Sequence, residues 1–175
     1  VSLRQGEGFG FRRLPSELPS DALSVYPNGF QATLKSNIND YSNSTGLRYS
    51  YDGWKIDLSN TFGFNSFKYN VDNSINYSLG VDSPTSFYAG KHSFLQNTVN
   101  LDFSKRINQN FSLAFGGEYR YEKYQIEAGD ESSYKGSGSE SFVGFSPLNA
   151  VKGDRNSVAV YVDGELKFGD FTANA

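Results

Sequence analysis

The chain has 175 residues, a net charge of -3, no cysteine and a hydrophobic fraction of 37%. The absence of cysteine excludes disulfides and thiolate metal sites, and no run of Lys or Arg could neutralise several phosphates, so nucleic acid is not an expected partner. Polar residues interrupt every apolar stretch, which excludes a spanning helix of about 20 apolar residues.

The first part of the chain gives few structural signals. Gly6, Gly8 and Gly10 form a Gly-x-Gly-x-Gly string, but no strand, turn and helix follow in the order that a dinucleotide site requires. From about Pro15 to Thr45 we expect a long polar connection, with about one turn of helix at 19–23.

The first hairpin is predicted at 47–62. Trp54, Ile56 and Leu58 alternate with polar residues, and Asp52-Gly53 separates this strand from the preceding strand at 47–51. Alternation with a period of two indicates a strand with one apolar side, and Asp-Gly is typical of a tight hairpin turn. A second long connection follows from about Asn65 to Phe94, and its alternation over 67–79 predicts a hairpin raised above the sheet.

The clearest strand runs from Phe111 to Tyr121, where every odd position is large and apolar or glycine. It follows a strand at 99–107 and a turn at 108–110. A third polar connection, about 129–156, contains the stretch SSYKGSGSES. A strand at 158–168 and a turn at Gly169-Asp170 complete the pattern, and a new strand begins at Phe171.

The connections therefore alternate between short turns and long loops. In an up-and-down sheet this places all turns at one edge and all loops at the other, as in outer-membrane barrels with short periplasmic turns and long external loops. We predict an all-β, antiparallel section of a transmembrane β-barrel, six to eight strands in one domain over 1–175, with Phe115 and Val160 on its lipid side. Because no secretion signal begins the chain and a strand has just started at its end, we expect a piece of a longer protein.

Charged residues are expected on the opposite side of the sheet. Glu118, Arg120 and Glu122 share one side of one strand, and their spacing predicts a ladder of paired charges that keeps an inner wall wet. Asp57, Asp102 and Lys55 lie at similar positions: all three are expected on polar faces.

The sequence predicts no catalytic, cofactor or metal site. His92 has no second histidine or cysteine beside it and is interpreted as a solvated loop residue. Asp130, Glu131 and Asp154 do not have the spacing of a twelve-residue calcium loop. No nucleophile, base and oxyanion donor are grouped, so we do not expect an enzyme.

Several short sequence motifs resemble the barrel portion of TonB-dependent outer-membrane receptors, most closely those of the Bacteroidetes type. The resemblance spans about residues 25–135. It depends on the order and spacing of the motifs and not on any single one of them. The motifs are Val25-Tyr26-Pro27-Asn28-Gly29-Phe30, Gly53-Trp54, Asp57-Leu58-Ser59, Ser83-Pro84-Thr85, Asn100-Leu101-Asp102 and Gly117-Glu118-Tyr119-Arg120.

This resemblance implies part of a barrel of about 22 strands in the bacterial outer membrane. It also implies two partners in the parent protein's function: a plug domain that fills the barrel and a periplasmic energy-coupling protein, TonB. The sequence contains neither a plug nor its coupling box, which favours a fragment from the middle of the barrel. The implied ligand is a scarce solute of the siderophore, cobalamin or oligosaccharide class, and Tyr88 and Tyr134 are candidate binding residues because such ligands stack on aromatic rings.

Two other readings of the same alternation are possible. A soluble β-sandwich that binds carbohydrate or protein would bury the apolar side on a second sheet and would stay dispersed without detergent. A complete eight-stranded membrane barrel would also fit the length, but its closing terminal aromatic is not present.

Overall fold

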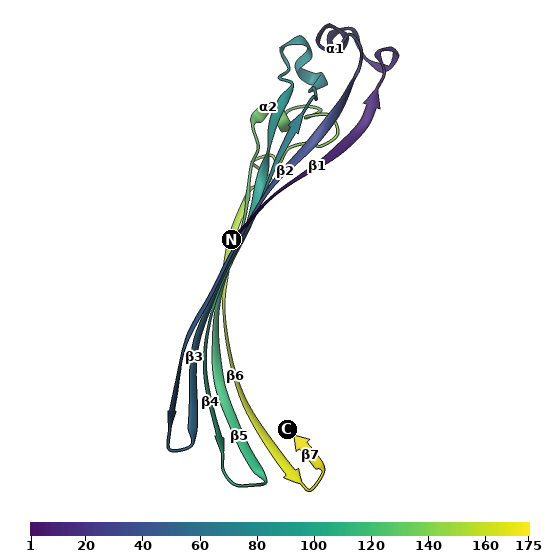
Figure 1. Cartoon of the computed structure of the whole chain (residues 1–175). Coiled ribbons are helices and arrows are strands. Elements are labelled where there is room, and N and C mark those ends of the chain that lie inside the picture. Colours follow the sequence, from purple (N-terminus) through teal and green to yellow (C-terminus); the bar gives the residue numbers. More distant parts are fainter. The chain divides into compact units, whose positions relative to one another are not determined.

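The computed structural model describes all 175 residues, which form a single sheet of seven strands in chain order (Figure 1). The order begins at β1 and ends at β7, so the sheet is open. The strands are β1 Ser2–Arg13, β2 Phe30–Tyr51, β3 Trp54–Asp72, β4 Ser86–Arg106, β5 Phe111–Glu127, β6 Val151–Phe168 and β7 Phe171–Asn174. The predicted antiparallel up-and-down arrangement is confirmed. Neither a closed eight-stranded barrel nor a two-sheet sandwich is formed by this chain, and both alternatives are wrong as descriptions of its fold.

The three tight turns lie where they were predicted. Asp52 and Gly53 have φ values of 47° and 75°, the left-handed conformation that a type I′ hairpin turn requires at both central positions. The Asn108 side chain accepts hydrogen bonds from the backbone N–H groups of Asn110 and Phe111, both at 2.9 Å. Gly169 also has a positive φ, 58°, between β6 and β7.

The long connections are shorter than predicted, because the strands extend into them. They cover 14–29, 73–85 and 128–150, whereas about 15–45, 65–94 and 129–156 were expected. β1 was not predicted; it pairs with β2 from Ser2 opposite Asp40 to Arg13 opposite Phe30. These boundaries were wrong because a strand ladder bonds backbone groups, so a polar segment such as 35–45 joins the sheet without an alternating apolar signal.

The raised hairpin is confirmed only in part. β3 does continue to Asp72, but the alternation beyond it, to Leu79, does not form a strand. Asn73 adopts a φ of 49°, and Asn76 caps the 3₁₀ helix η2 Tyr77–Asp82 by accepting a hydrogen bond from the Ser78 N–H at 3.0 Å. Local side-chain bonding of this kind competes with the extended conformation.

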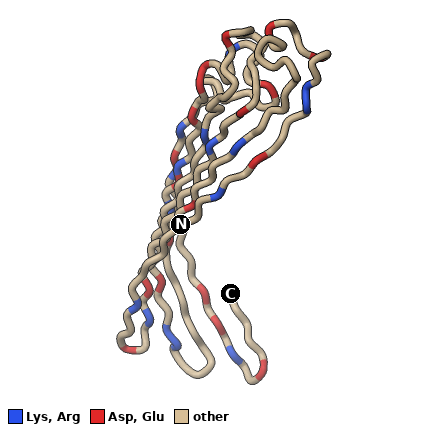
Figure 2. Tube along the Cα trace, turned by 45° about the horizontal axis from the view of Figure 1, so that its top comes forward, with Lys and Arg blue, Asp and Glu red and all other residues tan.

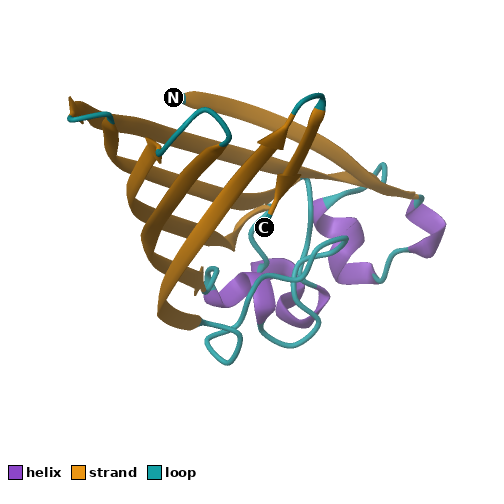
Figure 3. Ribbon diagram, turned by 90° about the horizontal axis from the view of Figure 1, so that it is seen from below, coloured by secondary structure: helices purple, strands orange, loops and turns teal.

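The chain divides into two compact units. Unit 1 contains Val1–Tyr41, Phe64–Phe94 and Tyr124–Gly153, and unit 2 contains Ser42–Gly63, Leu95–Lys123 and Asp154–Ala175. The three long connections belong to unit 1, together with the short helices η1 Pro15–Glu17, α1 Ser20–Val25, η2 and α2 Glu131–Tyr134, which are grouped in Figure 3. The three tight turns belong to unit 2. No helix has the length and hydrophobicity needed to cross a membrane.

Unit 1 has a hydrophobic core built by strands and loops together. α1 packs against η2, the Tyr26 ring stacks on Phe30 at 4.6 Å, and the Tyr69 ring stacks on Phe142 at 5.1 Å. Fully buried apolar side chains come from both kinds of segment. The core residues are Leu18, Ala22, Phe30, Ala32, Val71, Ile75, Phe87 and Ala89.

Unit 2 has no comparable core. Its aromatic residues contact one another along one side of the strands: Phe115 stacks on Phe103 at 5.0 Å and meets Trp54 edge-on at 5.8 Å. The Lys105 ammonium lies 5.5 Å from the Trp54 ring centre. Most of the large apolar side chains in this unit are exposed.

Candidate functional site

The strands of unit 2 carry two chemically different sets of side chains. Gly117 lies beside Val160 of the neighbouring strand, which joins the two strands that were predicted to share an apolar side. We call these alternating positions the apolar side; they are Leu47, Tyr49, Tyr51, Trp54, Ile56, Leu58, Val99, Leu101, Phe103, Leu113, Phe115, Val158, Val160 and Val162. The positions between them form the polar side, which is the candidate site.

One open hollow on the polar side has a volume of about 480 Å³ and extends from β2 to β6. Arg48 of β2 makes an ion pair with Asp57 of β3. The Tyr161 hydroxyl of β6 donates a hydrogen bond to Asp102 Oδ1 of β4 at 2.9 Å. Lys55 also contributes to the lining, so the prediction that Asp57, Asp102 and Lys55 lie on polar faces is confirmed, and one hollow brings all three together.

Gly116 makes the Tyr161 contact possible. Tyr161 reaches across β5 to Asp102, and a Cβ on Gly116 would lie 2.4 Å from Asp102 Oδ1 and 2.7 Å from Tyr161 Cε1. Any larger residue at this position would therefore displace the ring. Because Gly116 has no side chain, the Tyr161 ring of the next strand can pass close to the β5 backbone.

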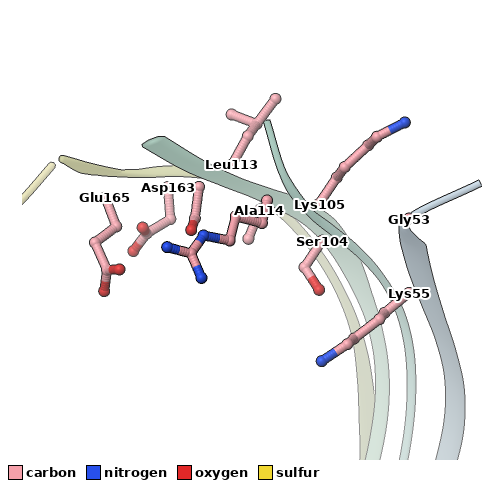
Figure 4. Close-up of a pocket in the computed structure, with 10 residues that line it drawn as sticks. Gly53, Lys55, Ser104, Lys105, Leu113, Ala114, Asp163 and Glu165 are labelled. Atoms are coloured by element: carbon pink, nitrogen blue, oxygen red, sulfur yellow. The ribbon is translucent and has the colours of Figure 1, made fainter. Parts of the chain in front are cut away.

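A second hollow, of about 350 Å³, lies near the tight turns. Figure 4 shows Lys55, Ser104, Asp163 and Glu165 on one side of the strands, whereas Leu113 and Lys105 project from the other. Basic and acidic groups are therefore mixed within one hollow. Lys/Arg and Asp/Glu positions also interleave along the traced strands (Figure 2), so no strand carries a field of a single sign.

The predicted ladder of charges on β5 is present. Arg120 contacts Glu118 at 2.7 Å, and Glu122, which is buried, contacts Arg155 of β6 at 2.5 Å. The Nε atom of Arg120 is buried without a hydrogen-bond partner. The three β5 residues could be predicted from the sequence but Arg155 could not, because the order of residues does not show which residues of neighbouring strands lie opposite one another.

The polar side presents acidic, basic and hydroxyl groups together. No group of three or more His, Cys, Asp or Glu side chains is placed to hold a metal ion. Its charged residues are mostly paired with one another, which is typical of a hydrated wall rather than of a reactive centre.

The two tyrosines proposed from the sequence lie in unit 1. Tyr88 is at the start of β4, where the Lys68 ammonium lies 4.9 Å from its ring centre. The Tyr88 carbonyl accepts a hydrogen bond from the Asp130 N–H at 2.8 Å. Burial, followed by the negative charge of Glu127, raises the pKa of Tyr88. Tyr134 is the last residue of α2 and is half-buried. A ligand role for either ring stays a prediction.

His92 is placed differently from its prediction. It is part of β4, not of a solvated loop, and its ring stacks on Phe67 at 5.5 Å and lies 5.6 Å from Tyr69. The polar neighbours Lys91 and Ser93 suggested a loop, but the extended β4 strand places this ring among aromatic side chains. The solvated-loop interpretation was therefore wrong.

The sequence did not predict the role of Asn76, which joins the loops 73–85 and 128–150 of unit 1. Asn76 is fully buried, and its Nδ2 donates to the carbonyls of Ser132 and Lys135, both at 2.7 Å. Its Oδ1 accepts from the Ser137 hydroxyl at 2.9 Å. Asn76 begins the short motif Asn76-Tyr77-Ser78, which does not indicate its hydrogen-bond partners in the other loop. Asparagine is common in this chain, so the sequence does not distinguish Asn76 from the other asparagines.

Comparisons with known proteins do not place the chain in a family. No protein-family model, no curated protein and no solved structure matches it.

Proposed function

We propose that this chain forms part of the wall of a bacterial outer-membrane β-barrel. In this assignment the apolar side of unit 2 faces lipid and its polar side faces a water-filled interior. The observation that carries the proposal is the alternation in unit 2, where large apolar side chains are exposed on one side and charged pairs occupy the other.

The exposure of the apolar side supports a lipid environment. Val160 is 84% exposed and Leu47 is 75% exposed. Proteins in water rarely leave a large contiguous apolar patch uncovered, because each Å² of it costs about 25 cal/mol. A hydrocarbon environment removes that cost and favours an apolar strand face of this kind.

The lengths of the strands also fit this assignment. β2 to β6 contain 17 to 22 residues each, whereas a tilted strand crosses a bilayer with about 9–11 residues. Each strand is therefore long enough to span the bilayer and to continue into a loop region. Tight turns and long loops also alternate along the chain, which is the pattern of outer-membrane barrels.

The more specific proposal is that the wall belongs to a TonB-dependent receptor that takes up a scarce solute. It rests on the sequence resemblance over about 25–135. In such a receptor a plug domain would occupy the interior, a periplasmic energy-coupling protein would act on the plug, and the loops of unit 1 would contribute to capture of a siderophore, a cobalamin or an oligosaccharide. Tyr88 and Tyr134 remain the proposed contacts.

Spin labelling tests which side of unit 2 faces lipid. The chain has no cysteine, so Val160→Cys and Ala159→Cys each give one labelled site on adjacent residues of β6. After reconstitution into lipid vesicles, we expect the label at 160 to respond to membrane-dissolved oxygen and the label at 159 to respond to a water-soluble nickel chelate.

Equal access of the nickel chelate to both labels would reject the lipid assignment. A protein that stays monodisperse without detergent and does not enter vesicles would favour the soluble carbohydrate- or protein-binding module instead. The receptor assignment has its own test: deletion of the gene should abolish energy-dependent uptake of one of the three solute classes, and unchanged uptake of all three would reject it.

A further inference from the structure

The apolar side of unit 2 is interrupted by a pair of amide side chains. Asn60 of β3 follows Trp54, Ile56 and Leu58 at the same spacing of two. Its Nδ2 donates to Oδ1 of Asn97 on β4 at 2.8 Å and to the Thr98 carbonyl at 3.2 Å.

The amide pair borders a hollow of about 320 Å³. The hollow is lined mainly by apolar side chains and backbone of three neighbouring strands, and Asn60 contributes directly to it. Its lining residues are Thr45, Gly46, Leu47, Leu58, Ser59, Asn60 and Val99. The apolar side therefore contains a depression with polar groups at its edge, whereas a uniform lipid-facing surface would have neither.

The pair has hydrogen-bonding capacity left over. The two bonds donated by Asn60 use both of its Nδ2 hydrogens, so Asn60 Oδ1 is left as an acceptor and Asn97 Nδ2 as a donor for groups outside the chain. A lipid acyl chain offers neither a donor nor an acceptor, and polar groups that face hydrocarbon without a partner are unfavourable.

We infer that this hollow is a contact surface for a second copy of the same chain within the membrane. The inference rests on the proposed function, because only a lipid environment makes the unpaired amide groups costly. One acceptor beside one donor is self-complementary: under a two-fold axis, Asn97 Nδ2 of each copy would donate to Asn60 Oδ1 of the other. Such an isologous contact uses the same patch twice, as most homodimers do.

The shape of the surface fits this occupant. Leu47 lines the hollow and is itself highly exposed, so it projects beside a depression that an equivalent side chain from the other copy can enter. Hydrogen bonds between amide groups together with close packing are the interactions that associate protein segments inside a bilayer, where the hydrophobic effect contributes nothing.

Disulfide cross-linking tests the contact, with lipid access measured in parallel. Thr45→Cys places one thiol at the hollow and leaves the amide pair intact, and Val158→Cys places one on the same apolar side but on β6. In lipid vesicles containing only this chain, mild oxidation should cross-link the Thr45→Cys protein into a species of twice the chain mass and leave the Val158→Cys protein monomeric. Adding Asn60→Leu and Asn97→Leu to Thr45→Cys should reduce the dimer about tenfold.

The outcomes separate this inference from the proposed function. If a spin label at position 160 reports lipid but Thr45→Cys cross-links no more than Val158→Cys, lipid fills the hollow and the inference is overturned while the proposed function stands. Dimer that persists undiminished in the double leucine variant would also overturn it, as would a cross-linked product of a mass other than twice that of the chain. A label at 160 that reports only water removes both assignments.

Discussion

Units 1 and 2 are built from the same five long strands, but the apolar residues of these strands lie in different environments in the two units. In β2, the apolar residues of unit 1 are even-numbered, as at Ala32 and Leu34, whereas those of unit 2 are odd-numbered, as at Leu47 and Tyr49. In unit 1 these side chains are covered by loops; in unit 2 they are exposed.

This comparison shows that alternation identifies a strand without identifying what covers it. A period of two produces one apolar side whether that side meets a loop, a second sheet or lipid. Where the apolar residues of a strand change from even-numbered to odd-numbered positions, the apolar side of the strand changes. Such a change indicates that the two parts of the strand contact different surroundings. The following variants test whether unit 1 depends on protein packing and unit 2 on its surroundings.

The largest expected effect is the loss of a core side chain in unit 1. Phe87 is 1% exposed and Phe171 of unit 2 is 82% exposed. Phe87→Ala should lower the free energy of unfolding by about 3–5 kcal/mol, measured by urea titration in detergent micelles. Phe171→Ala is the matched control and should change it little; equal losses would show that the two units do not differ in packing.

A charge on the apolar side of unit 2 comes next. Val160→Arg should destabilise the vesicle-inserted protein by about 2–4 kcal/mol if position 160 lies near the bilayer midplane. Ala159→Arg, one residue away on the polar side, should have a much smaller effect. Urea titration of both variants in vesicles measures the difference, and similar values for the two would contradict the lipid assignment.

Loop closure in unit 1 depends on Asn76. Asn76→Ala removes a fully buried side chain that donates to two loop carbonyls, which should cost about 1–3 kcal/mol. Because those carbonyls belong to Ser132 and Lys135, the amides of 131–141 should lose protection in hydrogen exchange. Asn43→Ala, at an exposed position of unit 2, should leave that segment unchanged. Unaltered protection in the Asn76 variant would mean that the loops meet through other contacts.

A larger residue at position 116 tests whether Tyr161 must pass close to the β5 backbone. Gly116→Ala introduces a Cβ within 2.4 Å of Asp102 Oδ1 and should destabilise unit 2 by about 1–3 kcal/mol through overpacking. Gly63→Ala is the control, because its Cβ would contact nothing within 4 Å. The free energies of unfolding of the two variants give the comparison. A neutral Gly116 variant would show that the ring has room to move.

The smallest expected effect is a pH dependence in unit 1. The hydrogen bond from Lys35, at 2.8 Å, and that from Ser86 lower the pKa of Asp72. A carboxyl whose pKa is lower in the folded state stabilises the protein above its unfolded pKa of about 3.9, and this contribution disappears as the pH falls through the folded value.

Asp72→Asn should therefore reduce stability at pH 7 by about 1 kcal/mol or less, the range of partly exposed ion pairs. The difference from the parent protein should vanish near pH 2. A difference that is the same at both pH values would assign the effect to packing rather than to charge.

Part of the candidate site was predictable, and the reason is local. Glu118, Arg120 and Glu122 lie two positions apart on one strand, so their common side follows from strand geometry. Arg155, Tyr161 and the role of Gly116 were not predictable, because each depends on which residue of the next strand lies opposite. The amide pair Asn60 and Asn97 was missed for the same reason.

The sequence by itself determined the tight turns, the antiparallel order and the two-sided character of unit 2. These features depend on neighbouring residues: positive φ at Asp52 and Gly53, and alternation set by the geometry of an extended backbone. Only the tertiary structure decided where the strands end, that β1 joins the sheet and that Asn76 binds carbonyls up to 59 positions away. Such contacts form when distant segments fold together, and they leave no periodic signal in the chain.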